Sequence, residues 1–338
     1  MPDWRRAGGL PSTTATIRSQ PEDFRVSEVM ELEFSGDGEH DWLLLEKTAN
    51  NTLWIARQLA RFAGIPLRDV GYSGLKDRHA VTTQWFSVRR ARGQDHAWTD
   101  FRLDGVVMLQ CVRHCRKLRR GTHRANRFEL TLRNVTDDPR PALERIAASG
   151  VPNYFGEQRF GHGGGNVLLA RRLFAGQRLK REQRSLALSA ARSLIFNDVL
   201  DARLEAGNWD VLLPGDIASL EGSNSHFPVE VVDETLVERC RQFDVHPSGP
   251  LWGRNGQADA RSEVERQVLA RHADFVAALE RHGDAARRSL RVCIHELETD
   301  YSGDTLTLKF TLQSGSFATA VLREIAVCND ASRESAVA

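Results

Sequence analysis

The sequence predicts an α+β protein with two domains, one of them interrupted by the other. Its 338 residues exceed the usual size of one domain and fall short of three. Strand patterns occupy both ends of the chain, and helical patterns fill the middle. Sheet-rich ends around a helical middle indicate a domain split by an insertion, although periodicity leaves open whether the two ends join.

The two ends of the chain combine strands with short helices. Residues 51–62 begin with asparagine and threonine, continue with apolar residues at helical spacing, and stop before a glycine, as a helix does. Residues 84–89 look extended. Apolar and polar residues alternate in 127–133 and again in 306–312, which is the pattern of half-buried strands. A short helix is expected to start around Ser316.

The middle of the chain predicts two long helices on either side of a loop-rich region. Residues 185–206 and 262–282 carry helical patterns that end at glycines. The second helix opens with a capping box formed by Ser262 and Glu265. Residues 210–250 are broken by glycine and proline, so we expect short strands and loops there.

Composition excludes several classes of protein. With 41% apolar and 27% charged residues, the chain has the composition of a globular protein, not of a disordered one. No apolar run is long enough to span a bilayer, and the N-terminus lacks the apolar segment of a secretory signal, so we expect a cytoplasmic protein. The five scattered cysteines indicate reduced thiols.

A strongly basic run occupies residues 111–127 in a chain whose 46 cations and 45 carboxylates almost balance. It contains no carboxylate, two histidines and seven cations, which are Arg113, Arg116, Lys117, Arg119, Arg120, Arg124 and Arg127. A solvated hairpin arm is the alternative interpretation. Because seven uncompensated cations repel one another, an anionic partner is favoured, and arginines suit the phosphates of RNA or DNA.

Motifs for metals and nucleotide cofactors are incomplete. Cys111, His114 and Cys115 lack a fourth ligand, and the surrounding arginines oppose a bound dication. The glycine cluster at residues 161–165 lacks the lysine of a P-loop and the spacing of a dinucleotide fingerprint. A turn is therefore favoured there, and we expect neither a metal nor a cofactor.

The segment GYSGLKDRHAVTTQ, residues 71–84, differs in kind because it places an aspartate between two cations in a glycine-bracketed loop. The charged form of Asp77 is favoured beside Lys76 and Arg78, so this carboxylate would serve as a nucleophile or a base. A salt bridge or a turn cap explains the same pattern equally well.

Several blocks of sequence carry a resemblance to a known family. They are PEDFRVSE (21–28), GYSGLKDRHAVTTQWFSV (71–88), RANRFEL (124–130), VPNYFGEQRFG (151–161) and SGSFATAVLRE (314–324). In this order they are similar to the TruD family of tRNA pseudouridine synthases, and they extend over nearly the whole chain. The resemblance implies a catalytic domain with a mixed, largely antiparallel sheet, interrupted by an α/β insertion domain. The catalytic domain would comprise residues 1–151 and 292–338, and the insertion residues 152–291.

The resemblance also implies a site and a reaction. Asp77 falls at the family's catalytic aspartate, and Phe24, Asn126 and Phe317 fall where the family lines its uridine pocket. The implied substrate is uridine 13 in the D-arm of tRNA, isomerised without a cofactor. No membrane and no obligate protein partner is expected, and the sequence leaves the oligomeric state open.

The residue types fit this chemistry, but each of them also has an ordinary structural explanation. The rings of Phe24 and Phe317 would stack on an extruded base, which contributes ~1–3 kcal/mol per base, or would pack in a core. Asn126 would hydrogen-bond the uracil edge or the ribose, or cap a turn. Attack by Asp77 at C6 of the base and attack at C1′ of the ribose both stay open.

The positive side chains are the candidates for tRNA contact. They are Lys76, Arg78, Arg116, Lys117, Arg119 and Arg120, of which Lys76 and Arg78 are equally suited to a structural pair. An RNA-binding protein without catalysis would use the same basic surface. A DNA-acting enzyme is a weaker alternative, because neither a DNA-reading helix nor paired metal carboxylates are present in the sequence.

Overall fold

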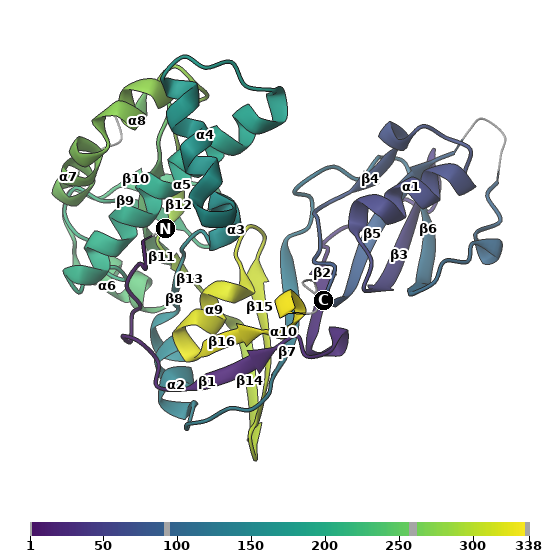
Figure 1. Cartoon of the computed structure of the whole chain (residues 1–338), viewed down its shortest axis with the longest axis horizontal. Coiled ribbons are helices and arrows are strands. Elements are labelled where there is room, and N and C mark those ends of the chain that lie inside the picture. Colours follow the sequence, from purple (N-terminus) through teal and green to yellow (C-terminus); the bar gives the residue numbers. More distant parts are fainter. Residues whose placement is uncertain (1, 91–94, 257–261, 335–338) are drawn as a thin grey trace. The chain divides into compact units, whose positions relative to one another are not determined.

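The computed structural model describes residues 2–90, 95–256 and 262–334, and the chain divides into two compact units (Figure 1). The sheet unit comprises residues 12–139, 294–315 and 326–338. The helical unit comprises residues 1–11, 140–293 and 316–325.

The sheet unit is built on an eight-stranded sheet in which only β2 and β5 pair in parallel among the described strands. The strand order is β14-β15-β7-β2-β5-β3-β6, and β4 pairs with β5. The strands are β2 (Phe24–Val29), β3 (His40–Thr48), β4 (Val70–Tyr72), β5 (Val81–Arg89), β6 (Val106–His114), β7 (Ala125–Leu132), β14 (His295–Ser302) and β15 (Thr305–Gln313). The predicted α+β class with a largely antiparallel sheet is confirmed.

The late strand β15 completes a sheet that the first third of the chain begins. It pairs antiparallel with β7 over eight residues, from Leu306 opposite Leu132 to Gln313 opposite Ala125. Alternate residues of both strands are buried, as the period-2 pattern predicts. A second, parallel pair joins β1 (Thr14–Ile17) to β16 (Val327–Asp330), which again ties the two ends of the chain together.

Helix α1 (Thr52–Phe62) begins where the sequence predicts. The side chain of Asn51 caps it by accepting a hydrogen bond from the backbone N–H of Leu53 at 2.9 Å. The helix buries Ile55 and Leu59 in a core shared with β3, β4 and β5. Short helices η1 (Pro21–Asp23), η2 (Leu67–Asp69), η3 (Trp98–Asp100) and α10 (Ala331–Glu334) complete the described part of this unit.

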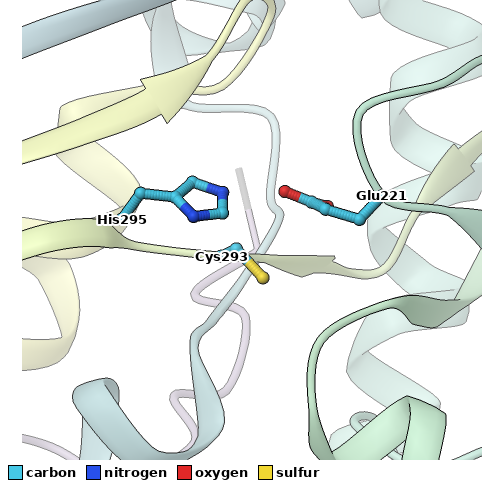
Figure 2. A group of neighbouring side chains, drawn as sticks. All are labelled: Glu221, Cys293 and His295. Carbon is cyan, nitrogen blue, oxygen red and sulfur yellow. The ribbon is translucent and has the colours of Figure 1, made fainter.

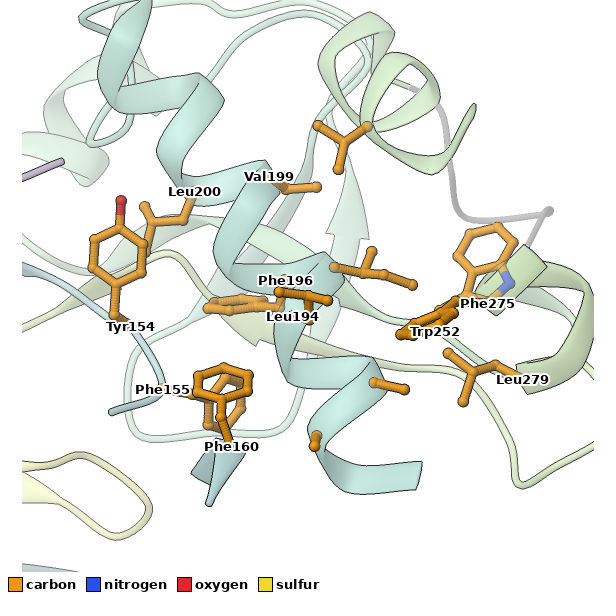
Figure 3. Close-up of a cluster of buried hydrophobic side chains, with 14 of the residues drawn as sticks. Tyr154, Phe155, Phe160, Leu194, Phe196, Val199, Leu200, Trp252, Phe275 and Leu279 are labelled. Carbon is orange, nitrogen blue, oxygen red and sulfur yellow. The ribbon is translucent and has the colours of Figure 1, made fainter. Parts of the chain in front are cut away.

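The helical unit surrounds the long helix α5 (Arg181–Glu205), which contains most of the predicted helix 185–206. Aromatic and aliphatic side chains pack along α5 and form the core, with Phe155, Phe160, Phe196 and Trp252 among the aromatic ones (Figure 3). The other helices are α2 (Arg140–Ser149), α3 (Glu157–Phe160), η4 (His162–Gly164), α4 (Gly165–Phe174), α6 (Glu234–Arg241), α7 (Glu263–Arg271), α8 (Ala273–Leu279) and α9 (Ala318–Ile325). Within the described ranges, every helix of the chain is too short or too polar to cross a membrane.

Short strands fill the region between these helices, as expected for residues 210–250. A four-stranded sheet has the order β10-β9-β11-β12, and a two-stranded sheet pairs β8 with β13. The strands are β8 (Val151–Pro152), β9 (Ile217–Leu220), β10 (His226–Pro228), β11 (Val245–Leu251), β12 (Ala286–Ser289) and β13 (Arg291–Val292). Glycines 161, 163 and 164 adopt positive φ on the way into α4, a conformation that a turn requires and that favours glycine.

The single helix predicted over residues 262–282 is wrong, because two helices occupy this segment. Ser262 caps α7 as predicted, by accepting a hydrogen bond from the backbone N–H of Glu265. The chain then leaves helical geometry at His272, with φ −113° and ψ 30°. The His272 ring pairs through Nε2 with Asp198 of α5 at 2.7 Å. The apolar pattern continues through the break because both helices bury residues in the same core.

The boundaries of the two compact units differ from the predicted domain boundaries. The N-terminal segment and α9 belong to the helical unit, where the backbone N–H of Ala7 donates to Glu324 at 2.9 Å. The Trp4 ring stacks on Tyr154 with centroids 5.9 Å apart. The division into residues 1–151 with 292–338 and residues 152–291 therefore stays a prediction about domains.

A lysine lies fully buried in the sheet unit, on β3. The Nζ atom of Lys47 donates to the backbone oxygen of Asn50 at 2.7 Å and to the backbone oxygen of Asp77 at 2.8 Å. Burial lowers the pKa of Lys47 to about 8, against the opposing attraction of the Asp77 carboxylate. The buried ammonium thus connects the core of the sheet to the loop that contains Asp77.

We expect Lys47→Met to change how stability depends on pH. The folded-state pKa of Lys47, about 8, lies below the value of about 10.4 in an unfolded chain, so the unfolded chain binds more protons between these values. Stability of the natural protein relative to the variant should therefore rise from pH 7 to pH 10, by about 2 kcal/mol. Urea denaturation at several pH values measures this difference.

The matched control is Lys309→Met, which removes an exposed ammonium from β15 of the same unit. A difference between Lys47→Met and the natural protein that stays constant from pH 7 to pH 10 would contradict the prediction.

Candidate active site

The loop between β4 and β5 is held by two buried side chains of neighbouring elements. The hydroxyl of Thr52, at the start of α1, accepts a hydrogen bond from the backbone N–H of Lys76 at 3.0 Å. The same hydroxyl donates to the side-chain oxygen of Gln84 at 2.9 Å, and the Gln84 amide donates to the backbone oxygen of Gly74 at 3.3 Å. Together with Lys47, these contacts set the backbone on both sides of Asp77.

The Asp77 carboxylate faces a cation that lies 59 residues earlier in the chain. Its side chain is 49% exposed, and its Oδ2 accepts a hydrogen bond from Arg18 at 2.9 Å. Arg18 also donates to Asp330 at 2.8 Å, so one guanidinium is shared by two carboxylates. Arginine is suited to this arrangement because its planar group carries several fixed donors.

Arg18 is held in an uncommon backbone conformation. Its φ is 55°, in the left-handed region that residues other than glycine seldom occupy. The guanidinium lies 4.1 Å above the centre of the Phe24 ring. Burial opposes the charge of Asp330, but hydrogen bonds from Ser332 and Arg18 outweigh it and lower the pKa of that carboxyl. Strain of this kind persists where the surroundings over-determine it, as they do in many functional sites.

The Lys76 ammonium turns away from solvent toward two buried side chains. It is 7% exposed, lies 2.9 Å from Oε1 of Glu28 and donates to Oδ1 of Asn126 at 2.8 Å. The Glu28 carboxyl is fully buried and accepts a second hydrogen bond from the backbone N–H of Trp85 at 3.1 Å. Burial raises the pKa of Glu28, against the opposing effects of Lys76 and of that N–H group.

A buried histidine lies on the other side of Asn126. Nε2 of His123 lies 3.4 Å from the Asn126 amide nitrogen and 3.1 Å from the Ser314 hydroxyl. Nδ1 lies 2.5 Å from the hydroxyl of Ser73. Burial, together with the charge of Lys76, lowers the pKa of His123 to about 4, so the ring is neutral at physiological pH.

The two phenylalanines of the predicted uridine pocket belong to different units. Phe24, on β2, is 3% exposed and meets the Phe128 ring edge-on, with centroids 6.4 Å apart. A base can therefore reach its face only if neighbouring groups move. Phe317 is 39% exposed and precedes α9 in the helical unit, so its place beside Asp77 stays a prediction.

The basic run covers the end of β6, the start of β7 and the connection between them. Since β6 and β7 are not neighbours in the sheet, a hairpin arm does not describe it. Leu118 anchors the run in a core with Trp42 and Trp85. A Cβ atom at Gly71 would lie 2.3 Å from the backbone oxygen of Leu118, so only glycine allows this approach of the run to β4. The backbone N–H of Gly121 donates to the backbone oxygen of Ser73 at 2.9 Å, next to the Asp77 loop.

Three of the seven cations in the basic run have carboxylate partners from other segments. Arg113 pairs with Asp95 at 2.6 Å, Arg127 with Glu296 at 3.1 Å, and Arg124 with Glu31. In the described part of the chain, no carboxylate pairs with the other four, which are Arg116, Lys117, Arg119 and Arg120. These exposed side chains reach the surface beside β4, where the Arg120 guanidinium lies 4.0 Å above the Tyr72 ring.

Glu221 and Cys293 of the helical unit offer ligand types suited to a metal (Figure 2), but their contacts point to a structural role. Oε2 of Glu221 lies 2.7 Å from Nε2 of His246, whose Nδ1 accepts a hydrogen bond from Arg291 at 3.1 Å. Burial raises the pKa of the Cys293 thiol to about 12. A protonated thiol beside a buried guanidinium does not favour a dication.

Sequence reasoning missed three groups that contact the predicted site residues. Arg18 stands three residues before the PEDF motif, Glu28 ends the PEDFRVSE block, and Lys47 follows the apolar run Trp42–Leu45 in a strand that also holds polar residues. Lys47 lies at an even spacing from Leu43 and Leu45, which is the weak signal that its side chain shares their buried face. For Arg18 and Glu28 the partners become visible only in the folded sheet.

Comparisons with known proteins agree with the motifs. The family model described as tRNA pseudouridine synthase D (TruD) matches residues 7–173 and 170–325. The chain is 47% identical to the tRNA pseudouridine synthase D of Nitrosococcus oceani, over 94% of this chain and 92% of the relative. It is 45% identical to that of Methylococcus capsulatus, over 96% and 94% of the two chains.

A solved structure shares the fold. The crystal structure of a putative tRNA pseudouridine synthase D from Methanosarcina mazei superposes with a TM-score of 0.68, at 20% identity, and covers 96% of this chain and 94% of its own. The two long family matches and the extensive identity to curated relatives establish the relationship. This chain belongs to the tRNA pseudouridine synthase D (TruD) family.

Proposed function

We propose that this protein isomerises uridine 13 in the D-arm of tRNA to pseudouridine, with Asp77 as the nucleophile. The observation that carries the proposal is a half-exposed carboxylate oriented by a largely buried arginine, in the loop that resembles the family's signature. The names of the curated relatives support the reaction class. Position 13 and the role of Asp77 rest on the resemblance of the motifs.

The reaction requires no group beyond the chain itself. The bond between N1 of uracil and C1′ of the ribose breaks, and a bond between C5 and C1′ forms. The hydrogen on C5 leaves and N1 gains one, so atoms and electrons balance without an oxidant or reductant. A carboxylate nucleophile divides this change into two easier steps, with attack either at C6 or at C1′.

Arg18 is arranged to serve the nucleophile throughout such a reaction. Attack converts the Asp77 carboxylate into an ester and removes its charge. The guanidinium keeps its second partner, Asp330 at 2.8 Å, and its contact with the Phe24 ring. It therefore stays in place while Asp77 changes charge, ready to receive the carboxylate when the intermediate breaks down.

We assign the surrounding residues to different parts of the substrate. Asn126 lies beside Lys76, the chain neighbour of Asp77, and we assign it to the uracil edge. Phe24 supports Arg18, and we assign Phe317 to stacking on the base, with Arg78 and the four unpaired cations of the basic run on the tRNA backbone. We also propose that residues 1–151 and 292–338 form the catalytic domain, with residues 152–291 inserted. A tRNA substrate supports a cytoplasmic location for the enzyme.

An RNA-binding protein without catalysis is the second candidate. It would use the same unpaired cations, but it gains nothing from a carboxylate held at 2.9 Å from a largely buried arginine. The first experiment is incubation with a uridine-labelled tRNA, followed by nucleoside analysis without added cofactor. Pseudouridine supports the enzyme, and tight binding without pseudouridine supports the alternative.

We expect Asp77→Asn to abolish pseudouridine formation to the detection limit, because the amide keeps the shape of the side chain but loses the nucleophile. The melting temperature should change little, since a half-exposed ion pair contributes about 0–1 kcal/mol. Binding of tRNA should persist or tighten slightly, because a negative charge near phosphates is removed.

The control is Asp37→Asn, which removes an exposed carboxylate from a loop of the sheet unit and should keep full activity. A well-folded Asp77→Asn protein that still forms substantial pseudouridine would disprove the mechanism.

We expect replacement of Arg116, Lys117, Arg119 and Arg120 by glutamine to weaken tRNA binding and to reduce its salt dependence. The slope of log K against log salt should fall by roughly 0.7–0.9 for each phosphate that the variant no longer neutralises. The matched control replaces Arg113, Arg124 and Arg127, whose carboxylate partners already compensate their charge. An unchanged slope in the fourfold variant would remove the four cations from the interface. An equal fall in the control would contradict the distinction between paired and unpaired cations.

A further inference from the structure

We infer that Lys76 is a positioning residue that makes Asn126 a pure hydrogen-bond donor toward the base, and that this contact selects uracil over cytosine. The inference rests on the proposed function, because it assigns a specificity to the site in which Asn126 meets the uracil edge. It gives Lys76 a role other than contact with the tRNA backbone.

The chemistry of the ammonium dictates the orientation of the amide. A lysine ammonium has three donors and no acceptor, so the Asn126 atom 2.8 Å from Nζ must be its carbonyl oxygen. The amide nitrogen must then point the other way, toward Nε2 of His123 at 3.4 Å. A rotation of the amide by about 180° would place two donors against the ammonium.

Lys76 is itself held in place through both its ammonium and its backbone. Its ammonium lies 2.9 Å from the buried Glu28 carboxylate, and its backbone N–H donates to Thr52 at 3.0 Å. Swinging the ammonium out to a phosphate would leave a fully buried carboxylate without its cation, which is strongly unfavourable. A Cβ atom at Gly74 would lie at ordinary van der Waals distance from the His123 ring, 3.4 Å, and from Nζ of Lys76, 3.6 Å, so the loop lies directly beside this group.

The histidine is compatible with the same orientation from the opposite side. The ring is neutral, and its Nδ1 lies 2.5 Å from the Ser73 hydroxyl, which also accepts the backbone N–H of His123 at 2.8 Å. Because the Lys76 contact directs the Asn126 amide nitrogen at Nε2, the matching tautomer carries its proton on Nδ1 and leaves Nε2 as the acceptor. The Asn126 amide nitrogen and the Ser314 hydroxyl both approach Nε2. One amide hydrogen of Asn126 faces this nitrogen, and among the described residues no acceptor faces the second.

The remaining donor of Asn126 distinguishes the two pyrimidines at C4. Uracil carries an oxygen there, which accepts a hydrogen bond, and cytosine carries an amino group, which donates. A donor in a fixed position favours uracil, whose oxygen accepts its hydrogen bond. It disfavours cytosine, because the amide donor and the amino donor would face each other and neither would have an acceptor. An amide able to rotate would accept both bases, so the preference depends on Lys76 and not on Asn126 alone.

The test compares Lys76→Met with the natural enzyme on two tRNA transcripts that differ only at the target position. For the uridine transcript kcat and KM are measured, and for the cytidine transcript the inhibition constant. The preference for uridine is the inhibition constant of the cytidine transcript divided by the KM of the uridine transcript. We expect the preference for uridine to fall about tenfold in the variant. Adding Asn126→Ala to Lys76→Met should lower the preference no further, because the two residues act as one unit.

Two further variants keep the test decisive. Glu28→Gln with Lys76→Met replaces the whole ion pair by neutral groups and should show the same loss of preference in a well-folded protein. Lys309→Met removes an exposed ammonium from the same unit and should leave the preference unchanged.

Three results separate the possibilities. Weaker binding of both transcripts by an equal factor would identify Lys76 as a contact to the tRNA backbone and overturn the inference. A preference that stays unchanged in the variants, with an active natural enzyme, would do the same. Absence of pseudouridine with the natural enzyme would instead overturn the proposed function.

Discussion

The backbone oxygen of Asp77 receives a hydrogen bond from a lysine buried in the sheet, and the geometry of the site depends on that contact. Lys47 lies on β3, where a charge is costly, and its ammonium is satisfied by backbone oxygens at 2.7 and 2.8 Å. The Asp77 loop thus supplies a partner that the core requires. Displacing the loop would leave a buried cation without that partner, which links the order of the loop to the stability of the sheet.

The cations of the site are divided among separate partners. Arg18 takes Asp77 and Asp330, Lys76 takes Glu28 and Asn126, and Lys47 takes backbone oxygens. Asp77 and Glu28 therefore do not share a cation. Among these three carboxylates only Asp77 is about half exposed, so it is the one most open to solvent.

The basic run shows how folding reshapes a charge pattern. Seven cations without a carboxylate in sequence become three paired and four unpaired cations in the described part of the sheet unit. The unpaired ones flank Leu118, which is buried and fixes the segment against β4 and β5. A positive surface next to the Asp77 loop suits a polyanion, and its position depends on the close approach that Gly71 permits.

Local signals in the sequence determined much of the fold and part of the site. The Asn51 cap, the alternating pattern of residues 306–312 and the glycine-bracketed loop around Asp77 each depend on neighbours within a few residues, and all three are found in the structure. The tertiary structure alone decided which cation faces Asp77, where the helix breaks at His272, and that α9 packs with the helical unit. The pairing of Arg18 with Asp77 spans 59 residues. Such a contact depends on strand order and register, which bring distant segments together and leave no trace in the spacing of residues along the chain.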